Sequence, residues 1–304
     1  MIHELLHLSE EIQYAVADKQ PIVALESSMI AYGMPILDNV TTVRQIEKCI
    51  RDQGAIPATI AIHQGKIHIG IDASLMQRLA TSPEVIRASR RDLAYVLSRN
   101  MSACTTVAST MFCAHLANIP LFVTGGIGGV HHHAAESFDI SADLIELSTT
   151  PVTVVCSGAK SILDLPKTLE MLETQGVPVV GYQTDEFPAF YSHSSGIPLL
   201  HRLDTTDEIA RLMVYQRKLC LKNGIVIANP IPKTAEIPDD QIMPIIKQAQ
   251  REAKHINGKS ITPFLLQRIA ELSAGQSLHA NIELIKSNAS LGARIAIAYQ
   301  NQHL

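Results

Sequence analysis

The chain has 304 residues, of which 46% are hydrophobic and 18% are charged, and its formal net charge is −4 at pH 7. This composition excludes a mainly disordered chain. Mild acidity, 4% aromatic residues and the absence of tryptophan leave no basic or stacking surface for nucleic acid. No apolar stretch approaches the roughly 18 residues that a membrane helix needs. We therefore expect neither nucleic acid nor a membrane as a partner.

The cysteines indicate a reducing compartment. Their number is odd, their spacings are wide, and no two form a CxxC pair: Cys49, Cys104, Cys113, Cys156 and Cys220. Neither a disulfide framework nor a thiolate zinc site is supported. The N-terminus brings in acidic residues at once and lacks the basic and apolar regions of a secretory signal. We expect a cytoplasmic protein.

Short apolar runs alternate with amphipathic stretches along most of the chain. The apolar runs predict strands over Pro21–Glu26, Pro57–His63, Lys66–Ile71, Pro120–Thr124, Val152–Cys156, Val177–Tyr182 and Gly224–Ala228. The amphipathic stretches predict helices over Asp38–Gln53, Asp92–Asn100, Thr105–Ala117, Ser161–Gln175 and Asp207–Leu221. This alternation indicates an α/β fold with a mixed, largely parallel sheet. No linker, charge block or internal repeat interrupts it, so we expect a single domain over residues 1–304.

Local signals add detail to this expectation. Gln64-Gly65 lies between two alternating strands and predicts a hairpin, so at least one antiparallel pair is expected. Beyond Pro238 the pattern is wholly helical. There, Thr262 precedes a proline and is expected to cap one helix, and Ser277 is expected to cap a last long helix.

Four strand ends carry residues that are unusual for plain connections. They are Glu26-Ser27-Ser28, Thr124–His133, Ser157–Lys160 and Asn229-Pro230. Because catalytic groups in α/β folds gather in loops at the carboxyl ends of strands, these four loops are the candidate site.

Glu26 follows four apolar strand residues directly, so we expect its carboxyl group to be half-buried. Burial disfavours the charged form and suits the group to donate a proton. The alternative is a structural role, in which the carboxylate accepts hydrogen bonds from the backbone amides of residues 27–30.

Lys160 follows the tight turn Ser157-Gly158-Ala159, and we expect Ser161 to open a helix. The ammonium group then lies at the positive end of a helix dipole, which lowers its pKa. A neutral amine is what Schiff-base attack on a sugar carbonyl requires. Phosphate binding beside the helix amides and an ordinary solvated lysine are the alternatives.

The segment TGGIGGVH (residues 124–131) places four glycines in five positions after a strand. It is either a phosphate cradle built from backbone amides or a structural glycine turn. It departs from the dinucleotide fingerprint, because His131 stands where the third glycine of GxGxxG would be. His131, His132 and His133 are adjacent, so their side chains diverge and cannot all bind one metal ion. One of them could donate to a phosphate.

Asp139 and Asp143 are spaced i and i+4 at an expected helix start, which predicts both carboxylates on one face. With Ser141 nearby they form a hard, oxygen-rich set suited to manganese or magnesium with several waters. The alternative is that both acids complement the positive end of the helix dipole.

Eleven segments along the chain carry a resemblance to a known family: ALESSMIAYGMP, IPATIAI, SRRDLAYV, TTVASTM, TGGIGGVH, FDISADLIEL, CSGAKSILDLPKTLEMLET, DEFPAFY, NGIVIANPIP, TPFLLQRIAEL and SLHANIELIKSNA. Together they resemble the pseudouridine-5′-phosphate glycosidases, the family that includes indigoidine synthase A-like proteins. The resemblance extends from Val23 to about Gln300.

The resemblance implies a three-layer α/β/α fold, a homotrimer, and a manganese ion in each subunit, with magnesium or another divalent ion as a substitute. It implies a small-molecule substrate, pseudouridine 5′-phosphate, cleaved reversibly to uracil and ribose 5-phosphate. By motif, Glu26 matches the proton donor, Lys160 the lysine that forms an imine with ribose C1′, and Asp139 the metal ligand. The substrate-binding positions are Arg87, Val107, His131, Ser141, Ala142, Asp143 and Asn281.

The implied chemistry agrees with these residue types. A C–C glycosidic bond has no leaving heteroatom to protonate, so the ordinary mechanism with two carboxylates is insufficient. A lysine that opens the ribose ring and forms an iminium as the C–C bond breaks accounts for an electron-poor C1′, and uracil needs a proton at C5 before it departs. Glu26 and Lys160 together suit that sequence of steps.

The chain also departs from the family pattern. Arg87 replaces a lysine, His132-His133 replaces Arg-Gly after His131, Tyr32 replaces a histidine, and Ser28 replaces a threonine. Arginine keeps the positive charge and can bind phosphate bidentately. Two alternatives follow. The chain acts by the same lysine chemistry on a different C-nucleotide, or it binds ribose 5-phosphate without catalysis.

Overall fold

One sheet holds every strand of the described chain. The computed structural model describes residues 2–31, 36–253, 256 and 261–302, and their eleven strands lie in a single sheet. The main path runs β1-β4-β3-β2-β7-β8-β11-β9-β10, with β6 beside β3 and β5 beside β6. The strands are β1 (Leu6–Leu8), β2 (Ile22–Glu26), β3 (Ile56–His63), β4 (Lys66–Ile69), β5 (Ile86–Ala88), β6 (Ala103–Thr105), β7 (Leu121–Val123), β8 (Thr153–Cys156), β9 (Val179–Tyr182), β10 (His201–Leu203) and β11 (Ile225–Ala228).

The helices are α1 (Ile2–Leu5), α2 (Glu10–Ala17), α3 (Ser28–Ala31), α4 (Ile36–Asp52), α5 (Ala73–Thr81), α6 (Leu93–Ser98), α7 (Val107–Leu116), α8 (Ala134–Ser137), α9 (Ala142–Thr149), α10 (Leu165–Thr174), α11 (Thr206–Lys218), α12 (Asp239–Glu252), α13 (Ile261–Leu272) and α14 (Gln276–Asn301). A short 3₁₀ turn, Arg90–Asp92, precedes α6.

The sheet is mixed and largely parallel, as predicted. Among the described strands, the antiparallel pairs are β3–β4 and β3–β6. The β3–β4 hairpin turns at Gln64 and Gly65, whose φ angles are 48° and 71°. Positive φ at both central residues is what a two-residue hairpin turn requires, so the predicted hairpin is confirmed.

The middle of the sheet is buried on both faces. Every residue of β2, β7, β8 and β11 is buried, and these four strands are neighbours in that order. Continuous apolar runs are typical of parallel strands that have helices over both faces. The carboxyl ends of these strands consequently meet at one edge, which brings the four unusual loops together.

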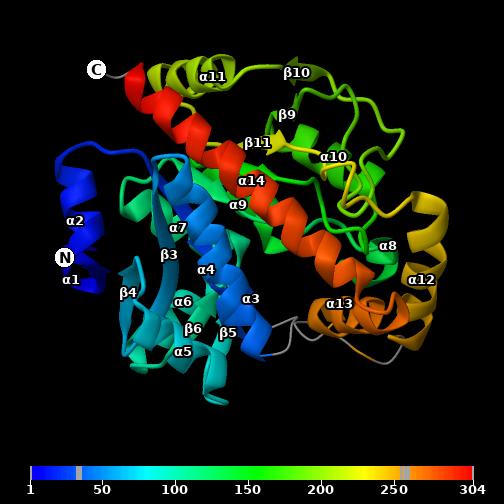
Figure 1. The fold of residues 1–304 in the computed structure, drawn as a ribbon, viewed down its shortest axis with the longest axis horizontal. Coiled ribbons are helices and arrows are strands. Elements are labelled where there is room, and N and C mark those ends of the chain that lie inside the picture. The colour runs from blue at the N-terminus through cyan, green and yellow to red at the C-terminus, as the bar shows by residue number, and fades with distance from the viewer. Residues whose placement is uncertain (1, 32–35, 254–255, 257–260, 303–304) are drawn as a thin grey trace.

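Helices cover both sides of the sheet. In Figure 1, α14 and α4 lie in front of the strands, α11 lies beside the C-terminal end of α14, and α7 and α9 lie behind the strands. Contacts agree, since α14 packs on α4, α11 and strands β2, β7 and β8, and α7 packs on α9 and on strands that include β2 and β7. The predicted three-layer α/β/α architecture is therefore confirmed.

The C-terminal part is helical, as predicted, but two of its expected caps are wrong. Helix α13 already includes Ile261, so Thr262 and its proline lie inside the first turn. Helix α14 begins at Gln276 after Gly275, and Ser277 is itself helical; its amide donates to Ser273 Oγ (3.1 Å). In both places the helix starts upstream of the residue with the capping side chain.

Four short strands have no counterpart in the predicted elements. β1, β5, β6 and β10 have three residues each, too few to show a periodic pattern. Thr105, expected in a helix, ends β6 instead. No helix in the described ranges is both long enough and apolar enough to cross a bilayer.

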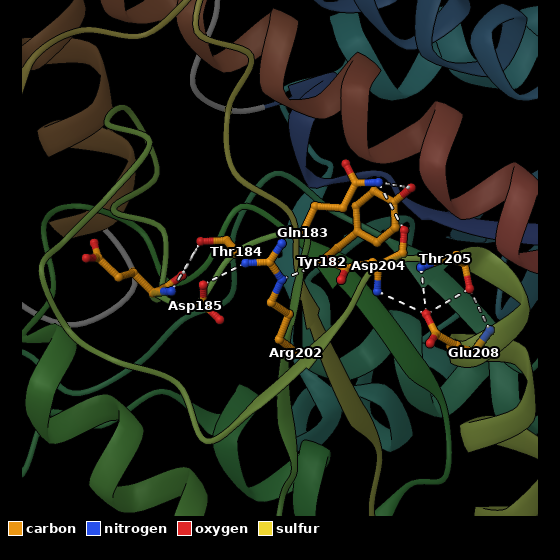
Figure 2. Close-up of polar contacts among 9 residues, drawn as sticks. Tyr182, Gln183, Thr184, Asp185, Arg202, Asp204, Thr205 and Glu208 are labelled. Atoms are coloured by element: carbon orange, nitrogen blue, oxygen red, sulfur yellow. Dashed lines mark hydrogen bonds and ion pairs between the residues drawn. The ribbon is translucent and has the colours of Figure 1, made fainter.

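The edge strand β10 fixes the start of a long loop after β9. Figure 2 shows Arg202 between two acidic residues: its Nη1 is 2.6 Å from Asp185 Oδ2 and its Nε is 2.8 Å from Asp204 Oδ1. Gln183 Nε2 donates to the backbone oxygen of Asp204 (3.0 Å). These contacts hold Gln183 and Asp185, at the start of the loop, against β10 and the residue that follows it.

Candidate active site

A cavity lies at the carboxyl ends of the central strands. It holds about 690 Å³, counting the part that is open to solvent. Six residues singled out from the sequence line it: Glu26, Arg87, Val107, Asp143, Lys160 and Asn281. These residues come from separate elements, so the fold alone brings them together.

Glu26 is the last residue of β2, and its side chain is 8% exposed. Thr124 Oγ1 donates to its Oε1 (2.5 Å), and Ser28 Oγ donates to its Oε2. Two hydroxyl groups therefore fix the carboxyl group from both sides. Among the described residues, both hydrogen-bond partners of the side chain are hydroxyls, so the alternative of a carboxylate that accepts from the amides of residues 27–30 receives no support.

Lys160 does not lie at a helix N-terminus. Residues 161–163 form a turn, and α10 begins only at Leu165 with Asp164 as its N-cap, so the helix-dipole argument is wrong. The pKa of Lys160 is lowered all the same, and burial is the main cause. The Arg87 charge acts in the same direction, whereas the negative charge of Glu26 works against it. The ammonium group donates to Gly126 O at 2.5 Å.

Asp143 belongs to the framework of the cavity. Its carboxylate is 7% exposed and accepts hydrogen bonds from the amides of Ala108 (3.0 Å) and Gly128 (2.8 Å). The glycine loop is thereby tied to the first turn of α7. Because Val130 N also donates to Thr168 Oγ1 (3.0 Å), these amides are already used within the protein, which favours the structural glycine turn over a cradle along the whole loop.

Arg87 is different, because part of its guanidinium has no partner. Its Nε is buried and makes no hydrogen bond to any described residue. Buried polar groups are almost always hydrogen-bonded, so an orphan donor in a cavity marks a place for an acceptor that comes with a ligand. Arg87 is the cavity residue best suited to receive an anion.

One buried amide joins three of the strand ends. Asn288 on α14 is fully buried, and its Nδ2 donates to Thr124 O (2.9 Å) and Ser157 Oγ (3.1 Å). Its Oδ1 accepts from Asn229 Nδ2 (2.9 Å). Gly292, one turn further on, lets the helix approach this closely: a Cβ there would lie 2.3 Å from Val123 Cγ2.

Four predicted site residues do not line the cavity. Ser141 caps α9, with Asp143 N donating to its Oγ (3.2 Å), and Ala142 is exposed in the first turn. Asp139 precedes the helix, so the predicted shared face of Asp139 and Asp143 is wrong. Asp139 instead lies beside His131, with 3.9 Å between Oδ2 and Nε2.

The histidines diverge as expected. His131 is near Asp139, whereas the exposed His133 lies 3.6 Å from Glu136. Burial lowers the pKa of His131, and the neighbouring carboxylate of Asp139 acts against this. The replacement at Tyr32 lies outside the described residues.

Several cavity residues were given no individual role in the site by the sequence. Thr124 looked like part of a glycine loop, yet its hydroxyl holds Glu26. Phe190 and three residues of α13, Thr262, Pro263 and Leu266, complete the wall. Nothing local distinguishes them from core or capping residues, because their role depends on contacts far away in sequence.

A family model described as indigoidine synthase A like protein matches residues 11–298. The chain belongs to the indigoidine synthase A-like family. A Legionella pneumophila protein is 68% identical over 302 residues, which cover 99% of this chain and 98% of that one. A Geobacillus kaustophilus protein is 54% identical over 297 residues, with 97% and 99% covered. Both relatives are named pseudouridine-5′-phosphate glycosidase.

Two solved structures have the same fold as this chain. The prealnumycin C-glycosynthase AlnA, crystallised with ribulose 5-phosphate, superposes with a TM-score of 0.91 at 35% identity and covers 99% of this chain and 98% of its own. An indigoidine synthase A-like protein from Thermotoga maritima gives 0.89 at 31% identity, with 97% of each chain covered.

The Asn288 contacts predict a stability effect in this indigoidine synthase A-like chain. Asn288→Leu keeps the number of side-chain heavy atoms but removes the hydrogen bonds to Thr124 O, Ser157 Oγ and Asn229 Nδ2, so the free energy of unfolding measured in urea should fall by about 1–3 kcal/mol. Gln300→Leu on the same helix is the control and should change stability by at most about 0.5 kcal/mol. Equal urea midpoints for the two variants would show that the amide holds nothing together.

Proposed function

We propose that this protein is a C-glycosidase that reversibly cleaves pseudouridine 5′-phosphate to uracil and ribose 5-phosphate through a lysine imine at ribose C1′. The observation that carries the proposal is the meeting of a buried, pKa-lowered Lys160 with Glu26 and Arg87 in one cavity. The names of the curated relatives supply the substrate.

The chemistry follows from the two reactive groups. The neutral amine of Lys160 bonds to C1′, and the ring oxygen O4′ leaves that carbon and takes a proton. Glu26 then gives a proton to C5 of uracil. The C1′–C5 bond breaks as the nitrogen lone pair forms the imine, and uracil departs neutral. Water hydrolyses the imine, which releases ribose 5-phosphate and restores the amine.

Lys160→Met tests this reaction. The variant should release no uracil from pseudouridine 5′-phosphate. Burial lowers the pKa of Lys160, so at neutral pH, below the ordinary lysine pKa, the buried amine destabilises the folded state relative to the unfolded chain. Removal of the amine should therefore also raise the melting temperature, by about 2–4 °C for each kcal/mol of folding free energy regained. Uracil release at the wild-type rate by a folded Lys160→Met protein would eliminate the imine mechanism.

Arg87 is proposed to hold the phosphate, because no described residue accepts a hydrogen bond from its buried Nε, and guanidinium groups bind phosphate bidentately. Arg87→Ala should raise KM about 10–100-fold, with a smaller effect on kcat. Arg91→Ala is the matched control, since the Arg91 side chain is 74% exposed and does not line the cavity. A change in kcat alone would place Arg87 in the chemical step instead.

A metal ion is proposed at Asp139. Within residues 2–31, 36–253, 256 and 261–302, no group of three His, Cys, Asp or Glu side chains is arranged to hold a metal ion, so no closed protein cage exists there. The Asp139 carboxylate is 39% exposed and fits an ion of the manganese or magnesium type, which keeps most of its waters. Such an ion orients groups through water when it is bound. Calorimetric titration with manganese should show binding that Asp139→Asn abolishes; equal binding by both proteins contradicts this site.

The proposed setting is a homotrimer in the cytoplasm. All five cysteines are free thiols, which suits a reducing compartment. Phe138, at the end of α8, and Ile145, in the middle of α9, are 81% and 60% exposed and offer apolar surface for a subunit contact. Light scattering should give the mass of three chains, and the mass of one chain would contradict the trimer.

A second candidate keeps the lysine chemistry but changes the base. It is favoured by the C-glycosynthase AlnA, which has the same fold and whose crystal structure contains ribulose 5-phosphate. Covalent capture of ribose 5-phosphate by Lys160, without uracil release from pseudouridine 5′-phosphate, would support it. A protein that binds ribose 5-phosphate without any covalent capture would be a non-catalytic family member.

A further inference from the structure

The loop after β9 contains a backbone conformation that the proposed mechanism does not use. Phe190, in the segment DEFPAFY, has φ = 65°, in the left-handed region that a bulky residue rarely adopts. Such residues persist only where the surroundings hold them, and they gather at functional sites. Phe190 is 2% exposed, and it lines the cavity together with Lys160.

Neighbouring contacts hold this conformation in place. Phe190 N donates to Ser157 O (3.2 Å), and Ala189 N donates to Ser192 O (3.1 Å), which closes a tight turn around Phe190. The ring meets Tyr191 edge-on, with 4.8 Å between the centroids. The turn therefore presses the Phe190 ring toward the loop that begins at Ser157 and carries Lys160.

A single glycine separates the ring from the amine. A Cβ on Gly126 would lie 2.7 Å from Phe190 Cδ2 and Cε2, so only glycine fits against the ring there. The carbonyl oxygen of the same Gly126 accepts the hydrogen bond from Lys160 Nζ at 2.5 Å. The ring thus packs against the residue that receives the amine.

We propose that Phe190 is a positioning residue: its ring excludes water from the Lys160 amine and fixes the Gly126 carbonyl that orients it. This rests on the proposed role of Lys160 as the amine nucleophile. The left-handed backbone conformation of Phe190 directs its aromatic side chain against Gly126.

Charged groups alone do not account for a neutral amine at this position. Glu26 on β2, Asp143 on α9 and the Cys156 thiol on β8 all favour the ammonium form, and Arg87 on β5 is the one that opposes it among the groups acting on Lys160. Burial is the largest influence and lowers the pKa of Lys160. A dry wall is therefore required, and Phe190 is the aromatic residue that supplies it.

The experiment measures the protonation of Lys160 directly, whether or not the enzyme turns over. Each lysine is acetylated briefly with acetic anhydride over a range of pH, and the extent at Lys160 is read by peptide mass, with exposed Lys222 as the internal reference. Phe190→Gly removes the ring and tolerates the left-handed backbone, so it should fold. It should raise the labelling midpoint of Lys160 by about one pH unit or more.

Two further variants complete the test. Phe190→Leu keeps an apolar side chain and should shift the midpoint less than Phe190→Gly does. Phe122→Leu changes a fully buried aromatic residue that does not line the cavity, and it should leave the midpoint unchanged. Equal midpoints in wild type and Phe190→Gly would overturn the proposal and leave Phe190 a packing residue only.

The measurements distinguish failure of the Phe190 proposal from failure of the proposed function. If the wild-type protein releases no uracil, the labelling midpoints still decide whether Phe190 keeps Lys160 dry. If uracil is released, the acidic limb of kcat/KM against pH should move upward in Phe190→Gly by the same amount as the midpoint. A lower rate with an unmoved acidic limb would contradict the proposal.

Discussion

The buried side-chain amide of Asn288 is the interaction on which the geometry of the cavity depends. It holds Thr124 at the end of β7, Ser157 at the end of β8 and Asn229 at the end of β11 against a single helix. Thr124 in turn fixes Glu26, and Ser157 begins the turn that ends at Lys160. Parallel strands bring their carboxyl ends to one edge, but side-chain distances within a hydrogen-bond length need such a cross-link.

The cavity brings charged and titratable side chains close together in a place that excludes most solvent. Lys160 lies between carboxyl groups that favour its charged form and a dry wall that favours its neutral form, and burial has the larger effect. The same low polarity that suits an amine nucleophile makes the orphan Nε of Arg87 costly until an anion arrives. In the proposed reaction, substrate binding and lysine activation therefore both depend on the low polarity of the site.

The sequence predicts the strands and the position of the site better than it predicts the contacts. Each long apolar run became a strand with ends within two residues of those expected, because strands buried on both faces are read directly from hydrophobicity. The sequence predicts that Glu26 and Lys160 lie in one cluster of loops, and both line the cavity. The helix-dipole argument for Lys160 is wrong, since no helix begins at Ser161. Its lowered pKa comes from burial, a property of the packed fold.

Residues whose role depends on distant partners could not be predicted. Asn288 reads as one polar residue of a helix, and its contact with Thr124 spans 164 positions. The sequence predicts Phe190 to be a core residue, because nothing about an aromatic residue in a sequence indicates that its φ is left-handed. The spacing of Asp139 and Asp143 suggested a shared face, but helix α9 begins between them.

The most direct test of this account is covalent capture at Lys160. The protein is incubated with ribose 5-phosphate and borohydride, weighed intact, and then mapped by peptide mass. The account predicts one sugar-phosphate adduct per chain, located on Lys160 and absent from Lys160→Met. No adduct, or an adduct that persists on another lysine in the variant, would contradict it.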